Sequence, residues 1–143
     1  MKTAIFSLLI VAMMFLSNYG QKNTVNNSNN PFFQEWKTPF GTPPFTEIKL
    51  EHYLPGYEEG IRQHDIEIDK IVANREVPNF KNTIEALELS GALLFKVDRT
   101  FQNLVSVITN NEMQVLAEKF ALMTAKHRDD IYLNEKLFKR IKA

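Results

Sequence analysis

The sequence predicts an all-α protein whose helices pack as antiparallel neighbours joined by short loops. Apolar residues recur at three- and four-residue spacing from residue 53 to the C-terminus, and this is the period of a helix. Asparagine, glycine and proline interrupt the pattern where helix caps and helix ends are expected. No segment shows a pattern that favours a strand.

The composition is that of one compact domain and argues against several functions. Of the 143 residues, 44% are hydrophobic and 24% are charged. Seventeen Lys and Arg balance seventeen Asp and Glu, so no net positive field would hold nucleic acid or an anionic membrane. Cysteine is absent, which excludes a disulfide framework, a thiolate zinc finger and a thiol nucleophile.

The first twenty residues are predicted to be a secretory signal peptide. Residues 1–20 contain one early charge, Lys2, and an apolar run over residues 4–16 that is too short to span a membrane. We expect cleavage between Gly20 and Gln21, export to the periplasm, and no stable membrane association afterwards. An uncleaved anchor is the alternative.

Between the signal peptide and the helices, two segments are expected to lack regular structure. Residues 21–30 are rich in asparagine and predict a flexible leader. Residues 31–51 form an irregular arm with four of the six prolines, which block helix and central strand. Burying each aromatic ring of this arm contributes about 1.5 to 3 kcal/mol, so the arm must lie on something apolar. It either wraps the domain's own helices or packs on protein outside this chain. Its aromatic residues are Phe32, Phe33, Trp36, Phe40 and Phe45.

Two long helices are expected next. The first runs from Tyr53 to Asn74, with Pro55 in its first turn, where proline is tolerated. The second begins with a capping-box-like pair at Asn82 and continues for about 26 residues. Gly91 lies on its apolar stripe, which suggests a close crossing by another backbone.

Two further helices complete the expected fold. A turn over residues 109–111 supplies cap chemistry for a helix that runs to about Asp129. Asn134 caps a last helix whose apolar face is made by residues 137, 138 and 141. Isolated helices below about 12 to 15 residues are marginal in water. The last helix is therefore expected either to fray or to continue in a longer natural chain, and we favour the second.

The histidines offer no metal-binding motif. A zinc site of the HExxH type needs two histidines on one helix face, and no such spacing occurs here. His64 with Glu67, and His127 with Asp130, are interpreted as solvated surface pairs. His52 is interpreted as a capping or packing residue.

Other groups also give no catalytic pattern. Neighbouring acids such as Glu58 with Glu59 are typical of the solvated side of a helix, and neither a GxSxG motif nor a phosphate-binding glycine loop occurs. The basic cluster over residues 136–142 suggests either a membrane-surface helix or favourable charge near a helix C-terminus. The sequence thus predicts no catalytic, cofactor-binding or metal-binding residue in this chain.

The order of several short segments carries a resemblance that covers residues 30–143. The segments are Asn30-Pro31-Phe32, Pro43-Pro44-Phe45 with Ile48, His52-Tyr53 with Pro55, Phe80, Asn82-Thr83-Ile84, Ala86-Leu87-Glu88, Ser90-Gly91, Thr109-Asn110 with Glu112, Asp130-Ile131-Tyr132-Leu133-Asn134 and Leu137-Phe138. This order resembles the amino-terminal region of bacterial peptidyl-dipeptidases in the thimet oligopeptidase and neurolysin family of zinc metallopeptidases. The block over residues 130–134 is its most specific part.

The resemblance implies a function for a longer protein. Such enzymes are all-helical and two-lobed, with a deep channel, and act on short peptides. The peptidyl-dipeptidase branch releases C-terminal dipeptides with water activated by zinc on an HExxH helix far downstream. Residues 31–143 would be an incomplete N-terminal domain that forms one wall of the channel, and the missing C-terminal catalytic region would be its partner. This chain alone would be inactive and would bind no zinc.

Two other functions remain open from the sequence. A stand-alone periplasmic helical module could bind a partner through the apolar face of the last helix. A peripheral membrane protein held by the basic last helix is the third interpretation.

Overall fold

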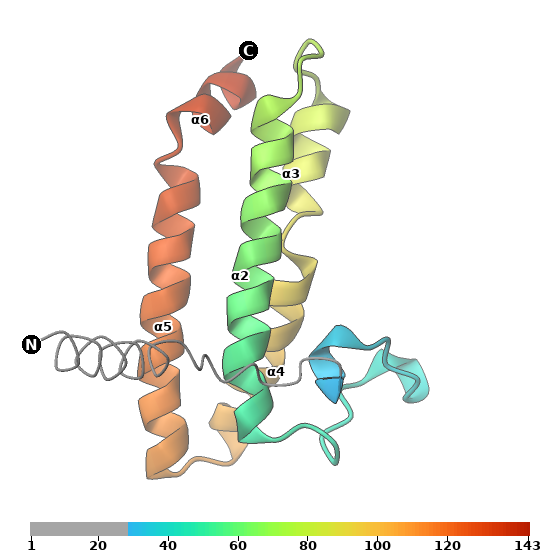
Figure 1. Cartoon of the computed structure of the whole chain (residues 1–143), viewed down its shortest axis with the longest axis vertical. Coiled ribbons are helices and arrows are strands. Elements are labelled where there is room, and N and C mark those ends of the chain that lie inside the picture. The colour runs from blue at the N-terminus through green and yellow to red at the C-terminus, as the bar shows by residue number, and fades with distance from the viewer. Residues whose placement is uncertain (1–28) are drawn as a thin grey trace, which may run out of the picture.

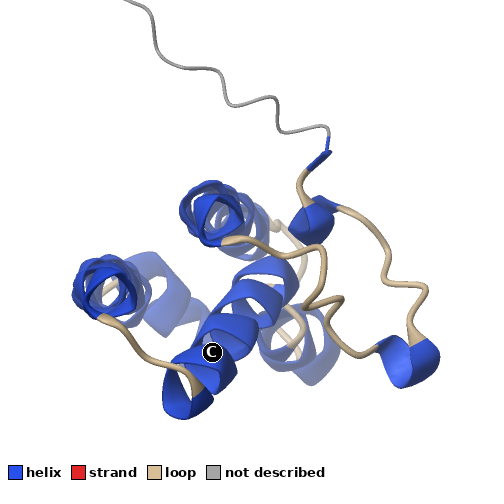
Figure 2. Ribbon diagram, turned by 90° about the horizontal axis from the view of Figure 1, so that it is seen from below, coloured by secondary structure: helices blue, strands red, loops and turns tan. Residues whose placement is uncertain are grey.

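The structure is a computed structural model and describes residues 29–143. The predicted signal peptide and most of the predicted leader lie outside the described residues. Within the described range all regular structure is helical, with no strand (Figures 1 and 2). The predicted all-α class is therefore confirmed.

The helices are α2 (Leu50–Ala73), α3 (Ala86–Glu88), α4 (Ala92–Val107), α5 (Asn111–Tyr132) and α6 (Glu135–Lys142). They are accompanied by the 3-10 turns η2 (Pro31–Phe33) and η3 (Pro39–Gly41) and by the π-helical segment η4 (Phe80–Glu85).

Three antiparallel legs, formed by α2, by α3 with α4, and by α5, make the body of the molecule. The chain ascends along α2, returns through α3 and α4, and ascends again along α5, so neighbours in sequence are antiparallel (Figure 1). An aromatic core joins them at the end where α2 begins. The ring of Tyr57 stacks on Phe120 with centroids 4.1 Å apart, and the ring of Phe101 meets Phe120 edge-on at 4.9 Å. This aromatic core consists of Phe32, Tyr53, Tyr57, Val97, Phe101 and Phe120, all fully buried.

The proline-rich arm divides into a docked part and an exposed part. Phe32 is buried against Tyr53, with ring centroids 5.1 Å apart. The ammonium of Lys96 lies 4.1 Å from the centroid of the Trp36 ring and donates hydrogen bonds to the carbonyls of Phe32 and Gln34. By contrast, Phe40 is fully exposed on the turn η3. The first part of the arm therefore wraps the domain's own helices, as one of the two interpretations expected.

The first long helix is longer at its start than predicted. It begins at Leu50, so Pro55 is its sixth residue and lies beyond the first turn. His52 has the capping role that we expected, because its Nδ1 accepts a hydrogen bond from the backbone N–H of Lys49 at 3.0 Å. Later in this helix, a Cβ added at Gly60 would lie 2.8 Å from the Cα of Leu94. The close backbone crossing is therefore at Gly60, and the prediction that placed it at Gly91 is wrong.

The predicted 26-residue helix is interrupted. Its N-cap is Asn79, whose side chain accepts from the N–H of Asn82, and the chain passes through η4 and α3 before it breaks at residues 89–91. Gly91 has φ +74°, a left-handed conformation that glycine adopts without strain. Both the backbone N–H and the hydroxyl of Ser90 donate to the carbonyl of Leu87, and the N–H of Gly91 donates to Glu67 instead. These bonds replace the continuous helical ladder.

The last two helices agree with the sequence except in length and anchoring. Helix α5 runs to Tyr132, three residues past the expected end. Asn134 caps α6 as predicted, because its side chain accepts from two backbone N–H groups. Arg140 is not a solvated charge at the helix end, since it is only 9% exposed and donates to the carbonyl of Asn74 at 2.7 Å. Together with the buried Leu137, this bond anchors the eight-residue helix to the rest of the described fold.

Candidate functional site

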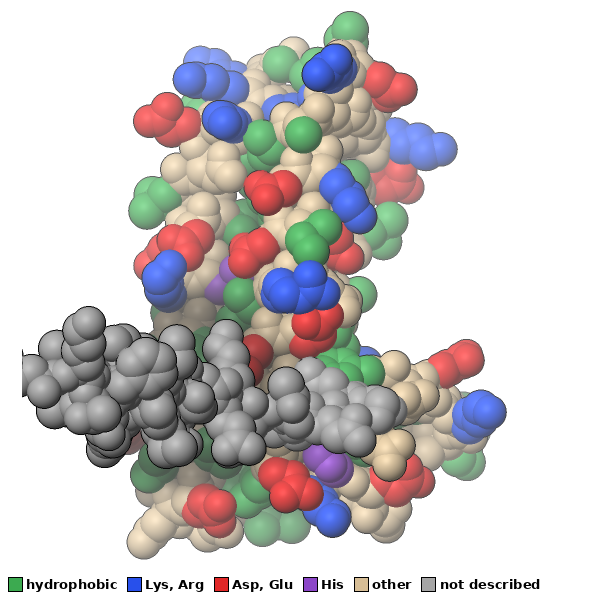
Figure 3. Space-filling model, in the orientation of Figure 1, with side chains coloured by type: hydrophobic (Ala, Val, Ile, Leu, Met, Phe, Trp, Pro, Cys, Tyr) green, Lys and Arg blue, Asp and Glu red, His purple; other side chains and the backbone are tan. Residues whose placement is uncertain are grey.

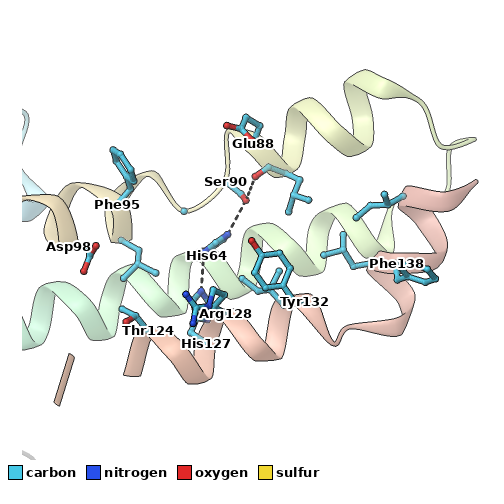
Figure 4. Close-up of a pocket in the computed structure, with 16 residues that line it drawn as sticks. His64, Glu88, Ser90, Phe95, Asp98, Thr124, His127, Arg128, Tyr132 and Phe138 are labelled. Atoms are coloured by element: carbon cyan, nitrogen blue, oxygen red, sulfur yellow. Dashed lines mark hydrogen bonds between the residues drawn. The ribbon is translucent and has the colours of Figure 1, made fainter. Parts of the chain in front are cut away.

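A groove of about 630 Å³ lies between the α3–α4 break and the pair α5 and α6 (Figure 4). Its walls are mainly apolar, and several of their side chains are exposed rather than packed, such as Phe95 and Tyr132. Two of the three residues predicted as the apolar face of the last helix, Phe138 and Ile141, are among these, whereas Leu137 is buried. The apolar lining consists of Leu87, Leu94, Phe95, Ile131, Tyr132, Leu137, Phe138 and Ile141.

A chain of polar contacts, which we call the histidine link (Asp65, His127, His64 and Ser90), crosses one side of this groove. His64 Nε2 lies 3.0 Å from Ser90 Oγ, and His64 Nδ1 lies 3.0 Å from His127 Nε2 (Figure 4). His127 Nδ1 in turn lies 3.3 Å from an oxygen of Asp65. The histidine link therefore connects α2, α5 and the α3–α4 break.

The two histidine pairs predicted from sequence are wrong. His64 is only partly exposed, and Glu67 is occupied by the N–H of Gly91 at 2.7 Å. His127 is 5% exposed, and Asp130 forms an ion pair with Lys126 instead. The true partners are 63 residues apart in sequence, so local spacing could not reveal them.

The electrostatics of the link favour a structural role. The pKa of His64 is lowered, first by burial and then by the neighbouring His127, while the acids Glu67 and Asp65 act in the opposite direction. The hydroxyl of Ser90 lies 2.6 Å from the carbonyl of Leu87, which is an acceptor only. The one hydroxyl proton is therefore committed to that carbonyl, and Ser90 is not poised as a nucleophile.

One further polar pair lies at the other end of the groove. The hydroxyl of Tyr57 donates to a carboxylate oxygen of Asp98 at 2.8 Å. Burial, and next the negative charge of Asp98, raise the pKa of Tyr57. This bond ties the aromatic core to the groove, since Asp98 also lines it. The remaining polar lining residues are Glu88, Thr124 and Arg128.

Neither a group of metal ligands nor a membrane-spanning helix occurs in the described part of the chain. Among residues 29–143, no three or more histidine or acidic side chains come together in a way that could hold a metal ion. None of the described helices combines the length and apolar character needed to cross a membrane. Basic and acidic side chains are interspersed over the face shown in Figure 3.

Comparison with known proteins gives two clear similarities. The chain is 43% identical over 116 residues to a dipeptidyl carboxypeptidase of Salmonella typhimurium, and 42% identical over 114 residues to one of Escherichia coli. These matches cover 81% and 80% of this chain. The chain spans only 17% of the length of each relative. No protein-family model matches the chain. The similarity confirms the predicted resemblance to a bacterial peptidyl-dipeptidase.

Proposed function

We propose that this chain is the N-terminal part of a peptidyl-dipeptidase, an enzyme that releases dipeptides from the C-terminus of short peptides. The observation that carries the proposal is the identity of 42 to 43% over four-fifths of the chain with two dipeptidyl carboxypeptidases. Identity at this level over more than a hundred residues indicates common descent. Because the match spans 17% of each relative, the activity belongs to the longer protein in this proposal.

Within that protein, residues 31–143 would form a helical wall of the substrate channel. Two features of the described residues support this role. The groove presents aromatic and aliphatic side chains that are not packed within the chain, and Phe40 stands fully exposed on its turn. Apolar surface of this kind is typical of a region that contacts other protein.

The zinc ion of the proposed enzyme does not fit the residues of this chain. The sequence contains no HExxH motif, and no suitable donor group occurs among residues 29–143. Zinc in peptidases is held by histidine and carboxylate ligands on a common scaffold. We therefore place the metal and the catalytic residues in the missing C-terminal region, and assign no catalytic role to any residue of this chain.

We further propose that the enzyme is exported to the periplasm. The support is the sequence of residues 1–20, with its short apolar run after a single charge. Fractionation of the source cells and N-terminal sequencing of the mature protein would test this. We expect a periplasmic protein that begins at or close to Gln21, and a cytoplasmic protein with an intact N-terminus would contradict the proposal.

The activity is tested on the protein encoded by the complete source gene. The full-length protein should release the C-terminal dipeptide from an N-terminally blocked tetrapeptide, and a chelator should abolish this activity. The 143-residue chain serves as the matched control and should neither cleave the peptide nor retain zinc after dialysis. A stop codon directly after Ala143, or several hundred further residues without an HExxH motif, would overturn the proposal.

A further inference from the structure

The histidine link is built so that its hydrogen bonds depend on the number of protons it carries. Because the Ser90 hydroxyl donates to the Leu87 carbonyl, Ser90 Oγ is left as an acceptor for the N–H of His64 Nε2. A neutral His64 then has a lone pair at Nδ1, which accepts from the N–H of His127 Nε2. In both contacts, Ser90 with His64 and His64 with His127, one atom donates a proton and the facing atom accepts it.

The remaining contact joins His127 to a carboxylate. His127 Nδ1 lies 3.3 Å from an oxygen of Asp65, and a proton on this nitrogen makes the contact a hydrogen bond to an acceptor. Asp65 therefore gives α5 a second contact with α2, beside the contact between His64 and His127.

Protonation of both rings would break the contact between them. The N–H of His64 Nδ1 would then face the N–H of His127 Nε2 across 3.0 Å, so that two donors would point at each other. Two positive imidazoles would then lie with ring centroids 4.9 Å apart in a partly buried site. Breaking this contact would remove the link of α5 to His64 and, through His64, to Ser90, while the contact of His127 with Asp65 would remain.

We propose that the His64–His127 contact is a pH-sensitive clamp, which holds α5 against α2 while at least one of the two imidazoles is neutral and lets the groove widen when both are protonated at acid pH. Opening would separate the C-terminal half of α5 from α2 and from the α3–α4 break. The aromatic core at the other end of the molecule, which contains no ionisable contact between α4 and α5, would stay closed.

The charged groups around the His64–His127 contact influence the pH at which it breaks. From α2, Asp65 and Glu67 face His64 and favour its protonated form. From α3, α4 and α5, the acids Glu88 and Asp98 and the cation Arg128 line the same groove. The residues that α6 contributes to the groove are all apolar. Burial and the charge of His127 are the largest influences on His64, and its pKa is lowered in the folded state.

The direction of the pH effect follows from this lowered pKa. Below about pH 6.5 the unfolded chain binds a proton at His64 that the closed folded state resists. The stability of the closed state therefore falls as the pH drops from about 7.5 to about 5.5. The open state escapes this penalty because its imidazoles are separated and hydrated.

The test is a distance measurement between spin labels on the full chain. Cysteine is absent, so Leu89→Cys and Tyr132→Cys can be labelled cleanly, and both side chains are highly exposed. The distance distribution across the groove should widen at about pH 5.5 relative to about pH 7.5. A control pair at Val107→Cys and Val115→Cys, on α4 and α5 near the other end, should not change.

Two variants separate the clamp from a general acid effect. In His127→Gln, the amide can rotate to donate to or accept from His64 Nδ1, so the widening at acid pH should disappear. In Asp65→Asn, at an exposed position, an acid that favours protonation of the histidine pair is removed, so the widening should move to lower pH. His52→Gln, which leaves the link untouched, should behave as the unmodified chain. An unchanged distance across the groove, or widening that persists in His127→Gln, would overturn the proposal.

Discussion

The two ends of the helical body are held together by different forces. At the end where α2 begins, rings from α2, α4 and α5 pack face to edge and exclude water. At the end with the groove, the buried apolar cluster is smaller, and the helices are joined by the histidine link and by Arg140. Apolar packing is insensitive to pH, whereas polar links across three helices depend on charge. One end is therefore held by an aromatic core, and the other by a smaller apolar cluster together with polar contacts.

The largest expected effect is loss of a ring from the aromatic core. Phe101→Ala should lower the free energy of unfolding by about 3 to 5 kcal/mol, because the buried ring leaves a cavity among Tyr53, Tyr57 and Phe120. Phe95→Ala, on the same helix but exposed in the groove, should change it by no more than about 0.5 kcal/mol. Denaturant titration of both variants measures the contrast. Equal losses would show that the groove end is packed as a core.

The next effect concerns the crossing of α2 and α4. Gly60→Ala should cost about 1 to 3 kcal/mol of stability, because the new methyl group would lie 2.8 Å from backbone atoms of Leu94 that cannot move aside easily. Gly56→Ala is the matched control, since its methyl group would meet only side-chain atoms of Val97 and Phe32 at 3.1 Å or more. Its cost should be smaller in thermal unfolding. The reverse order would mean that the backbones do not meet at Gly60.

The groove end is tested through its arginine. Arg140→Met removes the hydrogen bonds to the carbonyl of Asn74 and to the side chain of Asn82, and should cost about 1 to 3 kcal/mol. Lys139→Met, one residue earlier and exposed, should have an effect within about 0.5 kcal/mol. Amide hydrogen exchange should locate the loss in α6. A loss spread evenly over the aromatic core would contradict the division into two ends.

The smallest expected effect concerns helix capping. Asn134→Ala should cost about 1 kcal/mol, because the side chain caps two backbone N–H groups of α6. Asn110→Ala removes the cap of α5, which accepts from Met113 at the end with the aromatic core. Circular dichroism at raised temperature should show early loss of helix only for the first variant, because α6 is short and α5 is held along its length. Early loss in both would show that α5 also depends on its cap.

Local chemistry made much of the fold predictable. The caps at Asn110 and Asn134 and the helical period fixed the helices and their order, because these signals act within one turn. The break at Gly91 was missed because the apolar stripe continues across it. What stops the helix there includes a carboxylate of Glu67, 24 residues earlier in the chain.

The candidate site was less accessible to sequence reasoning. His64 and His127 meet only because α2 and α5 pack side by side, so neither residue has a local signal of its partner. Phe32 and Phe40 have the same side chain, yet one is buried and the other exposed. The difference is set by where the arm touches the helices, which depends on the whole fold.

The backbone contact at Gly60 has a mechanical consequence. Because α2 and α4 touch main chain to main chain there, these two helices cannot approach each other further. Helix α5 is fixed to them at Phe120 in the aromatic core, so the part of α5 from Phe120 to Tyr132 makes a lever about 18 Å long. A rotation of about 5° at Phe120 would carry the far tip by about 1.6 Å.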